Sequence, residues 1–426
     1  MKPSELIATI QSGGADIALK KVYVTDSAVE MQKPRYIKTI KKFIELFGDD
    51  RDVMVLSAPG RTEICGNHTD HNNGKVLAAS INLDAIAVAA KNDDNVINEK
   101  SEGHSLNTVD ISDLTPSEGM YGKSASMIKG VAAGLKNNGY KIGGFDACTT
   151  SDVMGGSGLS SSAAFEVLLG TVLSHLYNDG NIDAVTIAKT AQYSENVFFG
   201  KPSGLLDQMA SSVGTFVTID FESTENPVIK KVDFDFAQSG YSLCIVDTHG
   251  NHSDLTDDYA AVRGEMETVA KALGKNVLRE ISSDTFFRAI PELTGKVNDR
   301  AILRAVHFYN ENTRVEKAVS ALESNDFDVF KQVITKSGFS SFLYNQNVFT
   351  PNNPTEQKLS LALCLSQQLL EGKGAWRVHG GGFAGTIQAF VPNDCLEEYR
   401  KTMDDVFGEG SCHILIIRPV GGTRVI

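Results

Sequence analysis

The stretch Val153-Met-Gly-Gly-Ser-Gly-Leu-Ser-Ser-Ser-Ala-Ala-Phe-Glu-Val167 combines three glycines with three consecutive serines. Residues 144–153 alternate well enough to predict a short strand, and residues 159–177 carry apolar side chains at helical spacing. The cluster therefore lies where a strand leads into a helix. Free N–H groups at a helix start favour a phosphate, glycine lets the backbone approach it, and serine hydroxyls can bind phosphate oxygens or magnesium.

Three other interpretations of this stretch explain less. A glycine turn with a serine N-cap accounts for one serine and one glycine, but not for the whole cluster. A P-loop ends in Gly-Lys-Ser/Thr, and no lysine is present here. A dinucleotide fingerprint needs a third glycine, whose place after Gly156-Ser-Gly158 is taken by Ser161, so an NAD enzyme is disfavoured.

Length and composition narrow the class of protein. At 426 residues the chain exceeds one ordinary domain, so two lobes around one cleft are expected. The net charge of −13 argues against a nucleic-acid or membrane-surface binder, so the phosphate site must be local. The six cysteines are scattered without C-x-x-C spacing, and no signal-peptide pattern or membrane span is visible. These features predict reduced thiols and a cytoplasmic protein with small-molecule partners.

A second polar stretch, residues 58–74, lies between predicted strands at 53–56 and 76–90. It contains Arg61, a permanent cation, and His68 and Asp70, whose imidazole and carboxylate can bind sugar hydroxyls. The structural alternatives are an arginine paired with a surface acid, and Asp70 closing a turn. His68, Asp70 and His71 could also suggest a metal site, but no further partner at zinc spacing lies nearby.

A third polar stretch, residues 200–214, follows a predicted helix at 184–197 that contains Glu195. A carboxylate and a hydroxyl, completed by ATP oxygens and water, suit magnesium. The structural alternatives are that Glu195 is a solvated helix residue and that Asp207 caps a short helix at 208–212.

These stretches resemble motifs of one family, in family order. Residues 158–164 resemble the phosphate loop of the GHMP small-molecule kinases, and residues 58–74 resemble the galactokinase signature within that family. Further similarity at 200–214 and in the glycine cluster at 374–391 extends the resemblance from about residue 43 to the end of the chain. It implies an α+β, two-lobed GHMP kinase fold with the site in the cleft. The expected lobes are residues 1–215 and 216–426, with a last strand at 413–420 that returns to the first lobe.

The resemblance also implies an activity and its residues. The implied reaction is transfer of the γ-phosphate of Mg-ATP to the anomeric hydroxyl of a hexose, with galactose the first candidate, by a monomer or weak oligomer. Arg61 and Asp207 would be catalytic, and Ser162 and Glu195 would bind Mg²⁺. ATP would contact Gly156, Ser157, Gly158, Leu159, Ser160, Ser161 and Ser162, and the sugar would contact Asn67, His68, Thr69, Asp70, Gly204 and Tyr259.

Departures from the family pattern leave the sugar open. Asn67 replaces a glutamate and His71 a tyrosine, so N-acetylgalactosamine, arabinose or fucose are alternative substrates. The match around Tyr259 is looser, and packing against an apolar core is the alternative role for its ring. A sugar sensor without chemistry is a further alternative, but it has no need of the four predicted catalytic and metal-binding residues together.

Overall fold

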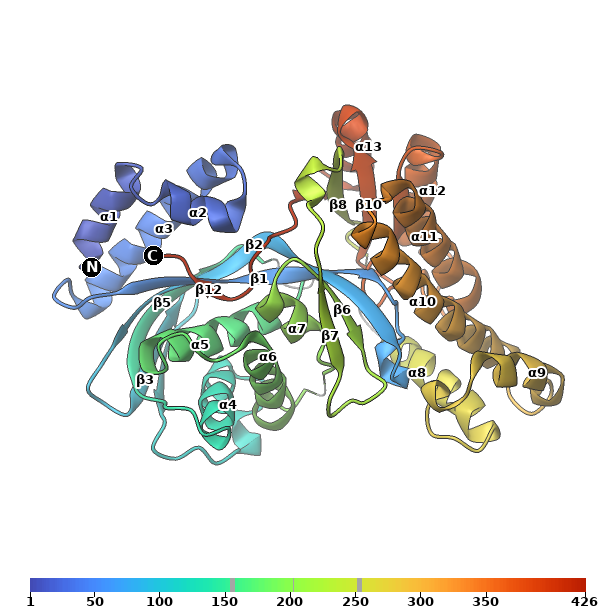
Figure 1. The fold of residues 1–426 in the computed structure, drawn as a ribbon, viewed down its shortest axis with the longest axis horizontal. Helices are drawn as coiled ribbons and strands as arrows, with labels where there is room; N and C mark the ends of the chain where they lie inside the picture. Colours follow the sequence, from blue (N-terminus) through green and yellow to red (C-terminus); the bar gives the residue numbers. More distant parts are fainter. Residues whose placement is uncertain (154–157, 202, 251–254) are drawn as a thin grey trace.

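The computed structural model describes residues 1–153, 158–201, 203–250 and 255–426, which form two β-sheets with helices packed against both (Figure 1). The larger sheet has the strand order β12–β1–β2–β5–β3–β4, with β6 paired to β2 and β7 to β6. Its pairs are antiparallel apart from β3 with β5. The strands are β1 (Met54–Cys65), β2 (Lys75–Lys91), β3 (Val96–Ser101), β4 (Leu106–Asp110), β5 (Phe145–Ser151), β6 (Phe216–Asp220), β7 (Val228–Val232) and β12 (Thr423–Arg424).

Helices cover both faces of the larger sheet, as Figure 1 shows. One face packs against α1 (Pro3–Gln11), α2 (Asp16–Tyr23) and α3 (Asp26–Phe47), and the other against α4 (Ser124–Asn137), α5 (Ser161–Tyr177), α6 (Ala184–Tyr193) and α7 (Leu206–Val213). Side chains along β1 alternate between the two faces, so Val55 joins the core under α3 and Leu56 the core over α5. Burial on both faces explains why these strands read as continuous apolar runs.

Asp84 interrupts the apolar sequence of β2 and lies fully buried in the sheet. Arg35 of α3 contacts its carboxylate at 2.7 Å, Arg418 at 3.0 Å, and the Tyr23 hydroxyl donates to it at 2.9 Å. Burial alone would raise the pKa of Asp84, but the two guanidinium groups outweigh it and hold the pKa below its usual value. Segments from both ends of the sequence therefore meet at one ionised side chain.

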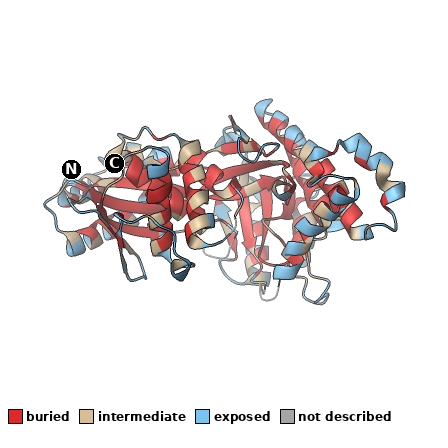
Figure 2. Ribbon diagram, turned by 90° about the horizontal axis from the view of Figure 1, so that it is seen from below, coloured by how far each residue is buried: buried red, intermediate tan, exposed pale blue. Residues whose placement is uncertain are grey.

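The smaller sheet has the order β11–β8–β10–β9, all antiparallel. Its strands are β8 (Tyr241–Asp247), β9 (Ala375–Val378), β10 (Thr386–Pro392) and β11 (Cys412–Leu415). The helices of this part are α8 (Thr256–Ala272), α9 (Ser283–Leu293), α10 (Asp299–Glu323), α11 (Phe327–Ser340), α12 (Lys358–Leu370) and α13 (Leu396–Phe407). Figure 2 shows buried strands through the middle of both parts and exposed residues on the outer helices and loops.

Most expected elements are present, with two corrections. The strand predicted at 53–56 is too short, because β1 continues to Cys65 and pairs with β2 through two irregularities. Arg61 therefore lies on a strand and not in a loop. The strand predicted at 413–420 ends at Leu415 within the smaller sheet. The return to the first lobe is made by the residues after it, where Ile417 bridges Ile81 and β12 pairs with β1.

The division between lobes at residue 215 stays a prediction. Strands β6 and β7, which follow that residue, belong to the larger sheet. The six cysteines all lie in the described ranges, and none of them is joined in a disulfide. Within those ranges no helix combines the length and the apolar character needed to cross a membrane.

Candidate active site

Arg61, Ser160 and Asp207 form a hydrogen-bonded group where β1, α5 and α7 meet. The guanidinium of Arg61 contacts Asp207 Oδ1 through Nε and Nη2, both at 2.6 Å, and its Nη1 donates to the carbonyl of Gly158. The Ser160 hydroxyl donates to the other carboxylate oxygen of Asp207. The predicted catalytic pair and the start of the serine-rich helix thus lie in direct contact.

Asp207 lies in the first turn of α7, whose N-cap is Leu205, so the alternative of a capping role for Asp207 is wrong. Burial raises the pKa of Asp207, but the charge and hydrogen bonds of Arg61 and the hydroxyl of Ser160 outweigh it and hold the pKa below its usual value. The Asp207 side chain keeps 37% of its surface exposed, against 10% for Arg61. The carboxylate is therefore ionised at neutral pH and still accessible to a reacting group.

The turn that leads into α5 has an unusual backbone. Gly158 has φ +73°, and Ser160 at the N-cap has φ +61°, a left-handed conformation that non-glycine residues seldom adopt. Ser161 and Ser162 are the first residues of α5. The Leu159 side chain is fully buried in the core, and its carbonyl accepts from the Arg61 amide at 3.1 Å. The predicted ATP contacts Gly156 and Ser157 lie outside the described residues.

Ser162 and Glu195, the predicted magnesium ligands, lie in contact, with the hydroxyl donating to Glu195 Oε1 at 3.2 Å. Glu195 is on a π-helical segment, Ser194–Phe199, that continues α6, and it is 2% exposed. The alternative of a solvated helix residue is therefore wrong. Lys201 Nζ lies 2.9 Å from the same oxygen, and Gln208 Nε2 donates to Oε2 at 2.8 Å. The Ser162 hydroxyl and the Glu195 carboxylate provide two oxygen atoms that can bind a cation, and the ammonium of Lys201 already lies beside the carboxylate. The position therefore suits a positive charge.

Glu166 was not expected at this site, although it follows Ser162 by one helical turn on α5. It is fully buried, and Gln208 Nε2 lies 3.4 Å from its Oε2 while also bonding Glu195. Burial, followed by the nearby charge of Glu195, raises the pKa of Glu166 to about 9. The side chain is therefore protonated at neutral pH. A glutamate on the otherwise apolar face of α5 was the available signal in the sequence.

A cavity of about 620 Å³ opens beside the start of α5 and is lined by Ser161, Ser162, Phe165 and Met127. Such a volume is typical of small-molecule sites. Ser161 and Ser162, two of the predicted ATP contacts, are thus part of a cavity wall.

Asn67, a predicted sugar contact, is 1% exposed and bonded to the protein on every side. Its amide Nδ2 donates to Glu63 Oε1 at 3.0 Å and to the carbonyl of Gly380 at 2.7 Å. Its Oδ1 accepts from Ser341 at 3.2 Å and from Asn347 at 2.9 Å. All four hydrogen-bonding positions of the amide are used, so the structure does not bring Asn67 to an open sugar site.

His68 and Thr69 are likewise buried and bonded within the protein. His68 Nε2 donates to the carbonyl of Gly381 at 2.8 Å, and burial, with a smaller effect of His71, lowers the pKa of His68 to about 3. The Thr69 hydroxyl lies 2.8 Å from the carbonyl of Gly66 and 2.6 Å from that of Lys75. Asn67 and His68 therefore connect the sugar signature to the glycine turn between β9 and β10, whereas Thr69 stabilises the signature itself.

Asp70 and Gly204 are brought together and remain partly exposed. A Cβ built on Gly204 would lie 3.1 Å from Asp70 Oδ2, so glycine keeps the space beside this carboxylate open. Tyr259 of α8 lies against the glycine turn, with its hydroxyl donating to the carbonyl of Gly382 at 2.9 Å and its ring edge-on to Phe383. Asp70 is thus the predicted sugar contact that is best placed to meet a ligand. The ring of Tyr259 packs against Phe383, in agreement with the alternative role predicted for it.

No group of three or more His, Cys, Asp or Glu side chains among the described residues could hold a metal ion alone. His249, His252 and Asp254 are close enough in the sequence to suggest a metal site, which is disfavoured, and His252 and Asp254 lie outside the described residues. A divalent cation at Ser162 and Glu195 would therefore need phosphate oxygens or water to complete its coordination.

Comparison with protein families and curated relatives gives consistent matches. Residues 41–91 match the model described as the galactokinase galactose-binding signature, and residues 126–215 match the GHMP kinases N-terminal domain. The galactokinase of Actinobacillus pleuropneumoniae is 32% identical over 381 residues, covering 88% of this chain and 94% of the relative. The galactokinase of Streptomyces coelicolor is 30% identical, covering 86% and 92%.

Solved structures show the same likeness. The galactokinase of Lactococcus lactis, crystallised with galactose, superposes with a TM-score of 0.75 at 26% identity, covering 90% of this chain and 98% of that chain. The mevalonate kinase of Methanococcus jannaschii superposes with a TM-score of 0.58 at 15% identity, covering 86% and 98%. At this identity the second match shows a likeness of fold alone.

Proposed function

Because the chain belongs to the galactokinase family of GHMP kinases, we propose that it transfers the γ-phosphoryl group of ATP to the anomeric hydroxyl of galactose. The observation that carries this proposal is the contact of Arg61, Asp207 and Ser160 at the start of α5. It places an ionised carboxylate, a fixed cation and the anion-binding end of a helix at one point. Phosphoryl transfer needs this positioning and charge neutralisation more than covalent chemistry.

Each residue of this group has a distinct role in the proposal. Asp207 accepts a hydrogen bond from the attacking sugar hydroxyl, orients it toward the phosphorus, and takes its proton as the bond to phosphorus forms. Arg61 holds Asp207 ionised and in place, and its positive charge stabilises the negative charge on the phosphoryl group during transfer. The N–H groups at the start of α5 and the hydroxyl of Ser161 bind the phosphate oxygens of ATP, while the Ser160 hydroxyl stays bonded to Asp207.

Ser162 and Glu195 are proposed to hold Mg²⁺ together with the nucleotide phosphates. A hydroxyl and a buried carboxylate, with oxygens 3.2 Å apart, are the donor type that magnesium prefers. The cation would neutralise charge on the β- and γ-phosphates. Gln208 keeps the Glu195 carboxylate in position through its bond to Oε2.

Asp70, with the open space at Gly204, is proposed to bind hydroxyls of the sugar. The other predicted sugar contacts are proposed to shape this pocket from behind through their hydrogen bonds within the protein. They are Asn67, His68, Thr69 and Tyr259. The replacement of a family glutamate by Asn67 was the reason to consider another sugar. Since the Asn67 amide is saturated by protein groups, it gives little support to that alternative.

The proposal is tested by measuring ADP release from Mg-ATP with galactose, N-acetylgalactosamine, arabinose and fucose in parallel. We expect galactose to give the highest kcat/KM and ADP release without sugar to be negligible. ADP formation that does not depend on any of the four sugars would contradict the assignment. A product phosphorylated elsewhere than the anomeric oxygen, detected by ³¹P NMR, would contradict the proposed orientation.

A further inference from the structure

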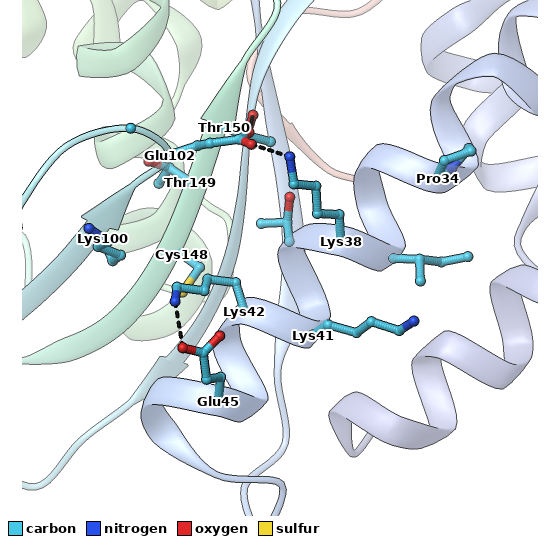
Figure 3. A pocket seen from close by; sticks show the side chains of 13 residues that line it. Pro34, Lys38, Lys41, Lys42, Glu45, Lys100, Glu102, Cys148, Thr149 and Thr150 are labelled. Atoms are coloured by element: carbon cyan, nitrogen blue, oxygen red, sulfur yellow. Dashed lines mark hydrogen bonds and ion pairs between the residues drawn. The ribbon is translucent and has the colours of Figure 1, made fainter.

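A second cavity, of about 840 Å³, lies between α3 and the strands β3 and β5, away from the catalytic group (Figure 3). Its walls include Lys38 and Lys42 of α3, Lys100 of β3, and Cys148 of β5. The volume falls in the range of pockets that bind small organic molecules. None of the proposed catalytic or sugar-binding residues lines it.

The charge of this cavity is opposite to that of the chain as a whole. Four lysines line it, at positions 38, 41, 42 and 100, against two glutamates, Glu45 and Glu102. The lining therefore carries an excess of two positive charges, whereas the chain has a net charge of −13. Such a local concentration of cations attracts anions.

The ammonium groups are accessible to a ligand. Figure 3 shows Lys38 and Lys42 extending from α3 toward β5, whereas Lys41 extends away from that strand. Lys38 pairs with Glu102, and Lys42 with Glu45 at 2.7 Å, but the side chains remain 73% and 41% exposed, respectively. Lys100 donates to the carbonyl of His104 and has no ion pair with a carboxylate among the described residues. Its charge is therefore not cancelled by a partner.

The rest of the cavity is apolar or neutral. Pro34 and Ile37 of α3 contribute apolar surface. Burial, followed by the charge of Glu99, raises the pKa of Cys148 to about 12, so the thiol adds no negative charge. The cavity thus offers cations for an anionic group and an apolar surface for a carbon skeleton.

This cavity adjoins the cavity of about 620 Å³ beside the start of α5, called the nucleotide cavity below because ATP is proposed to bind there. It does not include the serines proposed to bind phosphate. Glu102, Thr149 and Thr150 line both, whereas Ser161 and Ser162 line only the nucleotide cavity. The Thr150 hydroxyl donates to Glu102 Oε2 at 2.6 Å, while Lys38 bonds the other oxygen, so these side chains form a bonded partition. Two ligands can therefore be bound at the same time.

We propose that this cavity binds a small organic phosphate at a site separate from the nucleotide and sugar sites. Lys42 and Lys100 hold the phosphate group, and the apolar side chains of α3 contact the carbon skeleton. Lys38 remains paired with Glu102 in the partition and contributes to the positive potential.

The test uses the full chain with its other sites filled. Glucose 6-phosphate is titrated calorimetrically into protein saturated with galactose and with Mg²⁺ and a non-hydrolysable ATP analogue, and unphosphorylated glucose is titrated in parallel. We expect one molecule of glucose 6-phosphate to bind per chain, more weakly as salt is added, and glucose not to bind. Absence of binding by glucose 6-phosphate, or equal binding by glucose, would overturn the proposal.

Lysine variants locate the binding. Lys42→Ala and Lys100→Ala should each weaken the affinity for glucose 6-phosphate about fivefold, because each removes one positive charge beside the bound phosphate group. The control is Lys401→Ala, which removes a surface lysine that is likewise paired with a carboxylate, Asp405, but lies on α13, and it should change nothing. Affinity unchanged in both Lys42→Ala and Lys100→Ala would place the ligand elsewhere and refute this site.

Discussion

Arg61 and Asn67 lie close together in the sequence and belong to the same motif, yet the structure uses them differently. Arg61 points to the phosphate end of the site, formed by Arg61, Ser160, Ser162, Glu195 and Asp207, where charged side chains contact one another. Asn67 belongs to the sugar end, formed by residues 67–70 with Gly204 and Tyr259. There, Asn67, His68 and Tyr259 each donate a hydrogen bond to a carbonyl of the glycine turn between β9 and β10.

One sequence motif can therefore contain both residues that act on a substrate and residues that hold the structure together. Residues of the phosphate end carry charge into a partly exposed place, where it can act on a substrate. Asn67 and His68 connect two lobes and fix the position of their neighbour Asp70. The comparison can be tested by asking which substitutions change turnover and which change stability.

The largest effect is expected for Asp207→Ala, which removes the carboxylate that orients the attacking hydroxyl. We expect kcat to fall about a thousandfold, since general-base groups contribute that order of rate, while the circular dichroism spectrum stays unchanged. The measurement is ADP release coupled to a spectrophotometric assay. Activity above a few per cent of wild type would remove Asp207 from the phosphate end.

Arg61→Lys keeps the charge at the phosphate end but loses the two contacts from Nε and Nη2 to Asp207. We expect kcat to fall about a hundredfold with a smaller change in the KM for ATP, because the lysine cannot hold the carboxylate in the same way. Steady-state kinetics with both substrates separate the two constants. Arg51→Lys, at an ion pair with the buried Asp146 that involves no residue of the candidate site, is the control and should keep full activity.

Asn67→Ala tests the claim that this residue is structural. The change leaves buried partners without hydrogen bonds, so we expect the free energy of unfolding to fall by about 2 kcal/mol in urea titrations. The KM for galactose of the folded protein should change less than about twofold. An increase in KM with unchanged stability would instead place Asn67 at the sugar.

Asp70→Asn is the reciprocal test. It is nearly isosteric and partly exposed, so stability should hold, whereas the KM for galactose should rise about tenfold through loss of charged hydrogen bonds. The same urea titration and kinetic assay apply to both variants. A stability loss without a kinetic change would mean that the two ends do not differ as described.

The pH dependence of stability gives the smallest effect. The pKa of His68 is lowered to about 3 in the folded state, so between that value and its ordinary pKa the unfolded chain binds more protons and stability falls as pH falls. His68→Gln can keep the bond to Gly381 but cannot titrate. We expect the loss of stability between about pH 7 and about pH 5.5 to be about 1 kcal/mol smaller in this variant. An identical loss in both proteins would contradict a neutral buried His68.

The fold and the phosphate end could be predicted well because their signals are local. Glycines and serines between a strand and a helix predict the turn before α5, and apolar periodicity over 159–177 predicted α5 itself. The contact of Arg61 with Asp207 follows from two motifs of one family.

The sugar end and the second cavity could not be predicted from local patterns. The bonds of Asn67 to Gly380 and Asn347 join residues far apart in the sequence, and no spacing rule indicates them. The role of Glu166 depends on burial, which the sequence shows only as one polar residue on an apolar face. The extent of β1 was missed because polar residues paired with β2 resemble a loop in the sequence.

The junction at Asp84 has a consequence for how the molecule is made. The segment carrying Arg418 and β12 is synthesised after the whole smaller sheet, yet it completes the larger one. As the chain leaves the ribosome, Asp84 can meet Arg35 long before Arg418 is available. Until the smaller sheet has been translated, the larger sheet is therefore incomplete. One edge of β1 lacks its partner β12, and Asp84 lacks one of its two guanidinium partners.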